Sequence, residues 1–214
     1  MKERPILMTP ENAQKCHDGT KTQTRRIVKL NAAGRVQLAG SPKNWHVGDP
    51  NAVLACPYGQ VGDRLWVREA VEAEELRNGL DGVRYLADQS FRPIENTIEA
   101  GEQWGKLYHY AGKKGASVPS IHMPRWACRT VLEITEIRVQ RLQEISEEDA
   151  TAEGIEYHDG RGIGHSGYRH TQSHGYVYAT ARDAFKVLWE SINGPGSWDA
   201  NPWVWAISFR RMQP

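Results

Sequence analysis

Regular alternation of apolar and other side chains near the end of the chain constrains the fold most. Trp203, Trp205, Ile207 and Phe209 are each separated by one smaller or polar residue. Successive side chains of a β-strand point to opposite faces of its sheet, so this period predicts a half-buried strand over residues 203–211. Half-buried strands are typical of antiparallel sheets and barrels that turn one face to the core.

A second alternating segment covers residues 64–70. Leu65 and Val67 share one face with the carboxylate of Glu69, and a carboxylate is costly there unless it is paired or hydrogen-bonded. The opposite face carries basic and aromatic side chains: Arg64, Trp66 and Arg68. We therefore predict a strand that carries one chemically unusual position, Glu69.

Residues 127–142 form the longest strand candidate. The apolar phase changes within this segment, which predicts a bulge or a tight bend near Thr135 and Glu136. A weaker pattern predicts two further strands, near residues 83–87 and 106–110.

Short helices are predicted where capping residues precede a helical pattern. Thr9 and Pro10 suit the start of a helix over residues 10–17, and Gly19 suits its left-handed end. Two further helix starts are predicted at capping residues: Ser146 and Thr180. Together with the strand candidates, these helices indicate an α+β fold.

The segment that follows the first helix carries a family resemblance. Residues 21–28 are rich in threonine and β-branched side chains, which predicts a strand that begins at a corner after Gly19. Gly19, Lys21, Thr24 and Arg25 resemble the signature of the ASCH domain, a PUA-like β-barrel superfamily associated with RNA. Further segments resemble parts of phage and prophage members of this family: 61–69, 121–129 and 197–211.

The resemblance implies a mixed, mostly antiparallel PUA-like β-barrel flanked by short helices. We expect residues 1–214 to form one domain of this kind. The chain is longer than the family core, and insertions are expected at about 29–60, 77–114 and 157–179. Such insertions would cover the site, change its specificity or supply a separate surface for a partner.

Catalytic roles are implied by some members of the family, the N(4)-acetylcytidine amidohydrolases. Carried over, the resemblance assigns such roles to Lys21, Thr24 and Glu69. A threonine hydroxyl attacks a carbonyl only when a base removes its proton, and a partly desolvated lysine can be that base. We expect Lys21 and Glu69 to pair, either as part of a catalytic site or as a simple ion pair. On a regular strand Lys21 and Thr24 face opposite ways, so their cooperation requires a turn or bulge.

Basic and aromatic residues recur together on the strand candidates. We expect them to line a groove for nucleic acid: Arg25, Arg26, Arg64, Trp66, Arg68, Arg125, Trp126 and Arg129. Arginine binds phosphate with a planar fork, and tryptophan stacks on an unpaired base with about 1–3 kcal/mol. The alternative is that the arginines form surface ion pairs and the tryptophans pack into a core.

Composition limits the partners of the chain. The formal net charge is only +1, so any affinity for nucleic acid must come from local clusters of charge. The 3 cysteines form no C-x-x-C pair, which favours a reduced, cytoplasmic protein over a disulfide framework or a zinc site. There is no export signal and no apolar run of membrane-spanning length, so we expect no membrane partner.

Histidines gather in a glycine-rich segment, residues 154–175. The possible metal ligands there are His158, Asp159, His165, His170 and His174. Their spacing fits no closed zinc pattern, so we interpret the segment as a surface loop or a substrate lid. The sequence predicts neither a metal nor a cofactor.

Two functions compete at this point. The first is a hydrolase of nucleic acid, which cleaves single-stranded RNA or the acyl amide of a modified cytidine. The second is a non-catalytic module that binds single-stranded RNA or a modified nucleotide. Catalysis requires Thr24 Oγ1 and Lys21 Nζ within hydrogen-bond reach, whereas binding requires only an exposed basic and aromatic stripe. The oligomeric state is left open.

Overall fold

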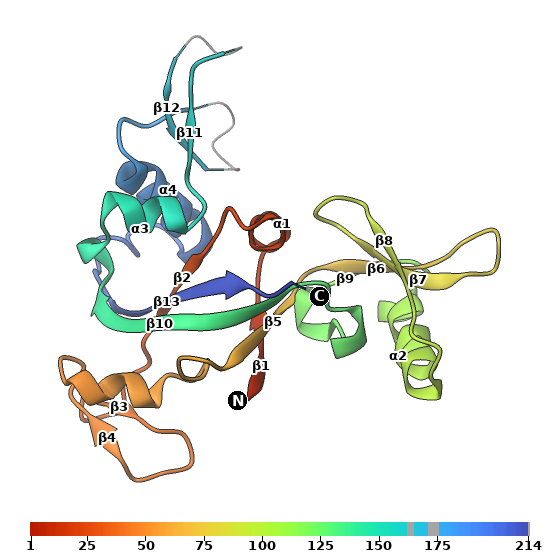
Figure 1. Ribbon diagram of the computed structural model, residues 1–214, viewed down its shortest axis with the longest axis horizontal. Coiled ribbons are helices and arrows are strands. Elements are labelled where there is room, and N and C mark those ends of the chain that lie inside the picture. Colours follow the sequence, from red (N-terminus) through yellow and green to blue (C-terminus); the bar gives the residue numbers. More distant parts are fainter. Residues whose placement is uncertain (162–164, 171–175, 214) are drawn as a thin grey trace. The chain divides into compact units, whose positions relative to one another are not determined.

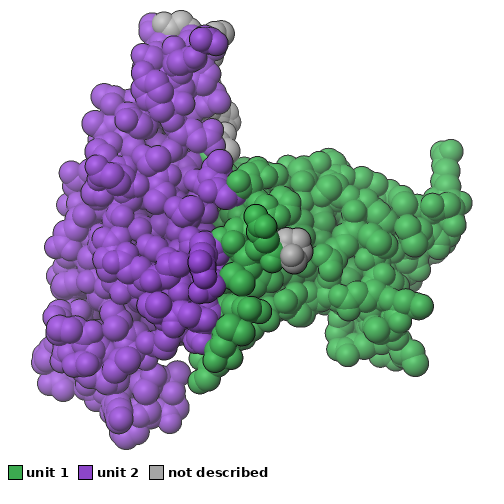
Figure 2. Space-filling model, viewed as in Figure 1, with its two compact units in different colours: residues 1–18, 64–132, 211–214 green, residues 19–63, 133–210 purple. Residues whose placement is uncertain are grey.

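The computed structural model describes residues 1–161, 165–170 and 176–213 and shows an α+β structure with mostly antiparallel sheets and short helices. The chain divides into two compact units (Figure 2). Unit 1 comprises residues 1–18, 64–132 and 211–214, and unit 2 comprises residues 19–63 and 133–210. The chain therefore passes between the units four times, and neither unit is one continuous segment.

The sheet of unit 2 contains the strand that follows Lys21. β2 (Gln23–Ile27) pairs antiparallel with β13 (Trp203–Arg211), and β10 (Val131–Arg141) lies on the other side of β13 (Figure 1). The predicted strand at the end of the chain is confirmed, but residues 204–207 are all buried. The centre of β13 is therefore covered on both faces and is not half-buried as the alternation predicted.

β10 confirms the longest predicted strand. Leu132 and Ile134 are buried, whereas Thr135 and Glu136 are both exposed. The alternation of exposure is thus interrupted where the change of apolar phase predicted a bulge or bend.

Two helices of unit 2 begin at the predicted capping residues. α3 (Glu147–Ala152) follows Ser146, whose Oγ accepts a hydrogen bond at 3.1 Å from the backbone amide three residues on. α4 (Ala181–Asn193) follows Thr180, whose Oγ1 accepts the equivalent bond at 3.0 Å. These caps satisfy amides that the helices leave without an internal partner.

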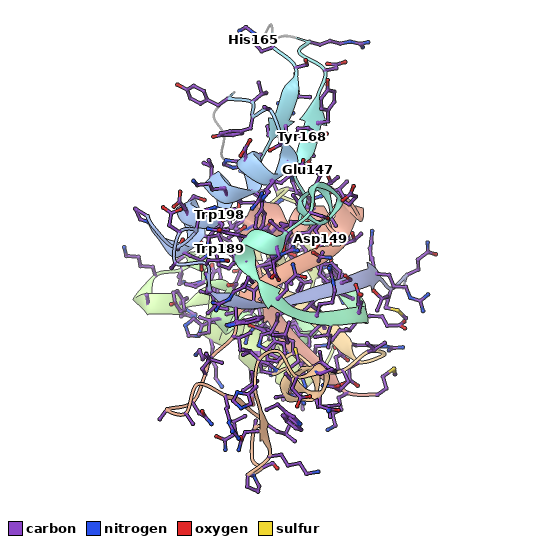
Figure 3. The ribbon with its side chains drawn as sticks, turned by 90° about the vertical axis from the view of Figure 1, so that its left-hand side faces the viewer. Glu147, Asp149, His165, Tyr168, Trp189 and Trp198 are labelled. Atoms are coloured by element: carbon purple, nitrogen blue, oxygen red, sulfur yellow. The ribbon has the colours of Figure 1, made fainter. Side chains whose placement is uncertain are left out.

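The core of unit 2 gathers beside α4. The Phe185 ring lies 6.1 Å from that of Trp189 and 6.4 Å from that of Trp198, between ring centroids. Figure 3 shows the two tryptophans close to one another. Val204 of β13 belongs to the same buried cluster, so α4 is held to the sheet by apolar contacts.

Short elements complete unit 2. They are β3 (Val36–Gln37), β4 (Asn44–Trp45), η1 (Pro50–Ala55), η5 (Leu142–Glu144), β11 (Glu156–His158) and β12 (Gly167–Arg169). β3 pairs antiparallel with β4, and β11 pairs antiparallel with β12. The expected insertions in this unit therefore each contain a small hairpin.

In unit 1, β1 (Glu3–Leu7) runs parallel to β5 (Arg64–Arg68). Leu65 and Val67 are buried, and the alternate positions of β5 are partly exposed, so the predicted two-residue period is confirmed. The chain therefore contains parallel strand pairing, between β1 and β5, as well as the antiparallel pairing of β2 with β13.

α1 (Pro10–Asp18) confirms the first predicted helix. Thr9 Oγ1 accepts a hydrogen bond from the backbone amide of Asn12 at 3.3 Å. Gly19 has a φ of +80°, the left-handed conformation that ends a helix without a steric penalty in glycine.

A second sheet of unit 1 has the strand order β8, β7, β6, β9 and is antiparallel throughout. Its strands are β6 (Val71–Glu75), β7 (Asp81–Tyr85), β8 (Phe91–Pro93) and β9 (Ser117–Val118). Val71 and Val83 are buried in a cluster that also contains Leu107 and Trp126. The predicted strand at 83–87 overlaps β7.

Residues 106–110 are not the strand that the sequence pattern predicted, because α2 (Ile98–Tyr108) extends into them. Thr97 caps this helix by accepting a hydrogen bond from an amide of its first turn at 3.1 Å. Ala100, Trp104 and Leu107 are spaced by three or four residues and contact the core of unit 1. The apparent alternation is part of this helical stripe.

The remaining short helices of unit 1 are η2 (Tyr110–Gly112), η3 (Ser120–His122) and η4 (Arg125–Ala127). Of the helices in the described ranges, none has the length and apolar character needed to cross a bilayer. No strand pairing in the described part of the chain closes a sheet into a barrel, so the PUA-like barrel stays a prediction.

Candidate functional site

Lys21 is bound to Glu153 within unit 2. Its Nζ donates to Glu153 Oε2 at 2.5 Å and to the Glu153 carbonyl oxygen at 2.6 Å, and the two residues are only 3% and 4% exposed. Glu153 is the C-cap of α3, where the free helix carbonyls attract a cation. Lys21 therefore ties the end of α3 to the segment before β2.

Arg25 extends this contact into a network of buried charges. Its Nη1 donates to Glu153 Oε1 at 3.1 Å and to Gln23 Oε1 at 2.6 Å, and its Nη2 donates to Asp149 Oδ2 at 2.6 Å. Asp149, labelled in Figure 3, also accepts bonds of 2.8 and 3.0 Å from Arg138. Burial opposes ionisation of Asp149, but hydrogen bonds from Arg138 and Gln23 outweigh it and lower the pKa of this carboxyl.

Thr24 does not take part in this network. Gln23 and Arg25 reach toward α3, so the intervening Thr24 side chain points to the other face of β2, where it is 4% exposed. Across the described ranges, no hydrogen bond joins Thr24 Oγ1 to Lys21 Nζ. The structure thus brings Lys21 together with Arg25 and does not bring it into contact with Thr24.

Glu69 lies directly after β5 in unit 1 and is 1% exposed. Arg129 donates two hydrogen bonds to the Glu69 carboxylate, from Nε to Oε1 at 2.8 Å and from Nη2 to Oε2 at 2.9 Å. Such a bidentate pair is the strongest form of the arginine–carboxylate contact. Burial nevertheless outweighs Arg129 and raises the pKa of Glu69 above its ordinary value.

The turn between β7 and β8 supplies more partners for Arg129. Its Nη1 donates to Asp88 Oδ2 at 2.6 Å and to Ser90 Oγ at 2.9 Å. Its guanidinium carbon lies 4.0 Å from the centroid of the Tyr85 ring, a cation–π contact. Arg129 is therefore fully engaged by groups of its own unit.

The expected pairing of Lys21 with Glu69 is corrected by these contacts. Lys21 has Glu153 as its partner, and Glu69 has Arg129. Both partners are distant in sequence, and no periodic pattern reports on contacts of that kind. The sequence did predict correctly that Glu69 would be buried and would need a partner.

His17 and Thr130 form another polar contact of unit 1. His17 Nδ1 and Thr130 Oγ1 lie 3.0 Å apart, which is hydrogen-bond distance. Burial, with added repulsion from Arg129 and Arg211, lowers the pKa of His17. No motif or periodic pattern in the sequence predicted this contact.

Trp66 lies on the half-buried face of β5, where it packs against the core of unit 1 and contacts two arginines. The guanidinium carbons of Arg68 and Arg125 lie 5.2 and 5.8 Å from the centroid of the Trp66 ring. Arg125 also pairs with Glu3 at 2.7 Å, with half of its side chain exposed. Arg64 lies on the same face by the period of the strand.

Three of the predicted nucleic-acid residues are not exposed groups. The Arg25 side chain is 0% exposed and that of Arg129 is 9% exposed, and both are held in ion pairs. Trp126 is 7% exposed and packs in the core of unit 1. Arg26 lies on the opposite face of β2 from Arg25 and is partly exposed. Arg25 and Arg129 are therefore structural ion-pair partners, and Trp126 is a core residue.

Two hollows of unit 1 lie along α2. The first has a volume of about 350 Å³, and its walls include Arg68, Gln103, Lys106, Tyr110 and His122. The second has a volume of about 490 Å³, and its walls include Glu95, Thr97, Gln103, Arg125 and Trp126. Gln103 borders both hollows, and each hollow has one of the two arginines that contact Trp66.

Several residues of these sites were missed from the sequence. Asp149 and Glu153 follow a helix cap, where carboxylates are usually solvated, so nothing marked them as buried partners. Lys106 was assigned to a strand, and His122 stood outside every motif. A helical interpretation of residues 98–108 would have placed Gln103 and Lys106 near one face.

No group of three or more His, Cys, Asp or Glu side chains in the described ranges is arranged to hold a metal ion. Of the histidines considered as ligands, His174 lies outside the described residues. His165, labelled in Figure 3, lies far from the labelled residues of α3 and α4.

Comparison of the chain with protein-family models, with curated proteins and with solved structures finds no match.

Proposed function

We propose that the chain is an ASCH-type protein with a PUA-like core that binds single-stranded RNA or a modified nucleotide on unit 1. The observation that supports this most is the contact of Trp66 with the guanidinium groups of Arg68 and Arg125, at 5.2 and 5.8 Å. Aromatic rings beside arginines are the combination that single-stranded nucleic acid requires.

The chemistry of each part fits this ligand. Arg68 and Arg125 offer planar forks of N–H donors, which match the oxygens of a phosphate group. Trp66 packs against the core of unit 1 but is partly exposed, and the exposed part of its ring is available to a base. The hollows beside α2 have room for parts of the ligand that extend away from β5.

We favour binding over catalysis because Lys21 is paired with Glu153. Lys21 Nζ donates to two oxygens of Glu153 at 2.5 and 2.6 Å, so it is engaged in a buried ion pair and is not directed at the Thr24 hydroxyl. Thr24 has no contact with it among the described residues. The amidohydrolase roles that the resemblance implied therefore lack their nucleophile–base contact.

The test is titration of a labelled single-stranded RNA with wild type and with Arg125→Gln. Loss of a charge-assisted phosphate contact should weaken binding by about tenfold, which corresponds to about 1.4 kcal/mol. Arg210→Gln is the matched control, because Arg210 pairs with Glu133 on the surface of unit 2. Equal affinity of Arg125→Gln and Arg210→Gln would count against this site.

Hydrolysis is the second candidate, and one observation favours it. Burial raises the pKa of Glu69, which suits a carboxyl that carries a proton during a reaction. Incubation with N(4)-acetylcytidine and with labelled single-stranded RNA, followed by mass spectrometry, tests it. Product from wild type and none from Glu69→Gln would support hydrolysis, and unchanged substrates would leave binding as the function.

A further inference from the structure

The hollow bordered by Arg68, Lys106 and His122 has two cationic side chains, Arg68 and Lys106, and its other walls include the apolar residues Leu107, Met123 and Pro124. Its volume is about 350 Å³, near the lower end of the range for small-molecule pockets. Among the described residues that line it, none is acidic. A hollow of this size and charge suits one small anionic group and not an extended chain.

Arg68 is a cation without a carboxylate partner in the described ranges. Its Nη2 donates to the carbonyl oxygen of Ile121, and its Nε is buried without a hydrogen-bond partner in those ranges. Burial lowers the pKa of this guanidinium, because no nearby negative charge offsets the loss of water. An anion in the hollow would supply the missing charge.

Two further side chains complete the walls. Lys106 lies in the last turn of α2, is exposed, and has no ion pair in the described ranges. His122 ends η3, and its ring lies 5.3 Å from that of Tyr110, tilted by 46°. Tyr110 and His122 thus form an aromatic wall beside the cations, on which a base or a sugar could pack.

We infer that this hollow binds the terminal phosphomonoester of a nucleotide or of a single RNA strand. An internal phosphodiester carries one negative charge, whereas a terminal phosphomonoester carries close to two at neutral pH and has three free oxygens. Arg68, Lys106 and His122 can give each of these oxygens a donor. The hollow is open to solvent on one side, and its volume of about 350 Å³ accommodates one terminal nucleotide.

This inference rests on the proposed function, because the strand that follows the terminal phosphate would lie over Trp66 and Arg125. Arg68 serves both parts, since it borders the hollow and contacts the Trp66 ring. Lys106 and His122 line the hollow, whereas the cation–π contacts with Trp66 come from Arg68 and Arg125, so substitutions of Lys106 and His122 address the hollow.

The experiment compares three labelled RNA strands of one sequence, with a 5′-phosphate, with a 3′-phosphate, or with neither. Wild type should bind one phosphorylated strand about tenfold or more tightly than the unphosphorylated strand, and the two phosphorylated strands show which end is held. Lys106→Gln and His122→Gln should remove most of that preference and leave the affinity for the unphosphorylated strand nearly unchanged. Lys113→Gln, an exposed lysine outside this wall, is the matched control.

Each of the remaining outcomes refutes either this inference or the proposed function. Equal affinity for all three strands would refute the inference and leave the proposed function standing. A preference that persists in the double variant Lys106→Gln/His122→Gln would place the phosphate elsewhere and also refute it. If no strand binds, but a nucleoside monophosphate binds wild type and not Lys106→Gln, the binding of single-stranded RNA fails as the proposed function and the phosphate site stands.

Discussion

The buried carboxylate of Glu153 pairs with two cations. Lys21 and Arg25 both donate to its carboxylate, and all three side chains are at most 4% exposed. Buried charges of this kind contribute little net stability, because the loss of hydration offsets their attraction. They are costly to break, since one unpaired charge is then left inside the protein.

Removal of the carboxylate should therefore unfold the protein more easily. We expect Glu153→Ala to lower the free energy of unfolding by about 3–5 kcal/mol, because Lys21 and Arg25 lose their common acceptor. Chemical denaturation of wild type and variant measures this difference. Glu133→Ala breaks only the exposed pair with Arg210 and should cost less than about 1 kcal/mol; similar losses in the two variants would contradict the argument.

The protonation of His17 gives a pH-dependent prediction. Burial and the charges of Arg129 and Arg211 lower its pKa in the folded state, whereas the unfolded chain has the ordinary value near 6.5. The unfolded state therefore takes up the proton first as the pH falls. The contribution of His17 to the free energy of unfolding is full above about pH 6.5 and is lost as the pH falls toward the folded-state pKa.

Two measurements check this sign. An NMR titration of the His17 ring should give a pKa below 6.5, and His17→Gln should flatten the dependence of unfolding free energy on pH just below that value. The difference between wild type and variant isolates His17, because Glu69 titrates in both proteins. A folded-state pKa above the ordinary value would refute the prediction.

Single positions were predictable where the signal was local. Glu69 was recognised as a buried carboxylate because the strand period fixes the face of each residue. Its partner Arg129 was identified as basic but assigned to a surface, since the sequence does not state which side chains meet across sixty residues. The separation of Thr24 from Lys21 was predictable from the strand period, because Thr24 lies on the face of β2 opposite to Gln23 and Arg25.

Among the secondary-structure elements, helix starts were the most predictable. Thr9, Ser146 and Thr180 each accept a hydrogen bond from a backbone amide of the helix that follows. A cap acts within four residues, so the local sequence contains the whole interaction. α2 was missed because part of its apolar stripe resembles a short alternating strand.

Glycines in β7 and α2 give a matched pair of substitutions. A Cβ at Gly82 would lie 2.3 Å from the carbonyl oxygen of Arg92 and 2.4 Å from the Phe91 ring. Gly82→Ala should therefore separate β7 from β8 and lower the free energy of unfolding by about 1–3 kcal/mol. Thermal or chemical unfolding measures the loss.

Gly101→Ala is the control for this prediction. The added Cβ meets nothing within 4 Å, and the position lies inside α2. Alanine is the better helix former, so this variant should be more stable by about 0.5–1 kcal/mol. A stabilising effect of Gly82→Ala, or equal effects of the two variants, would contradict the packing of β7 on β8.

On the scale of the whole molecule, the near absence of net charge has a measurable consequence. The formal net charge is +1, so nonspecific attraction to nucleic acid should be weak. If Arg125 contacts one phosphate group and Arg68 and Lys106 together contact the terminal one, the slope of log affinity against log salt should be about −1.4 for a single strand. Arg125→Gln should reduce its magnitude by about 0.7, and Arg210→Gln should not; a slope that Arg125→Gln leaves unchanged would refute the contact.

The division into two units is the part of the fold that the sequence did not predict. Periodicity and caps describe segments of up to about fifteen residues, whereas each unit assembles segments from distant parts of the chain. The α+β class and the mostly antiparallel pairing follow from local patterns and are confirmed. Unit membership depends on contacts that no local pattern encodes.

The chain passes between the units four times, and this restricts how the protein can evolve by recombination. A recombination event at one point between residues 19 and 210 joins parts of both units from one parent gene to parts of both from the other. Neither unit can be exchanged as an intact block by a single crossover. Descendants of this chain would therefore diversify through point substitutions and through changes in the length of its small hairpins, and not through the shuffling of whole modules.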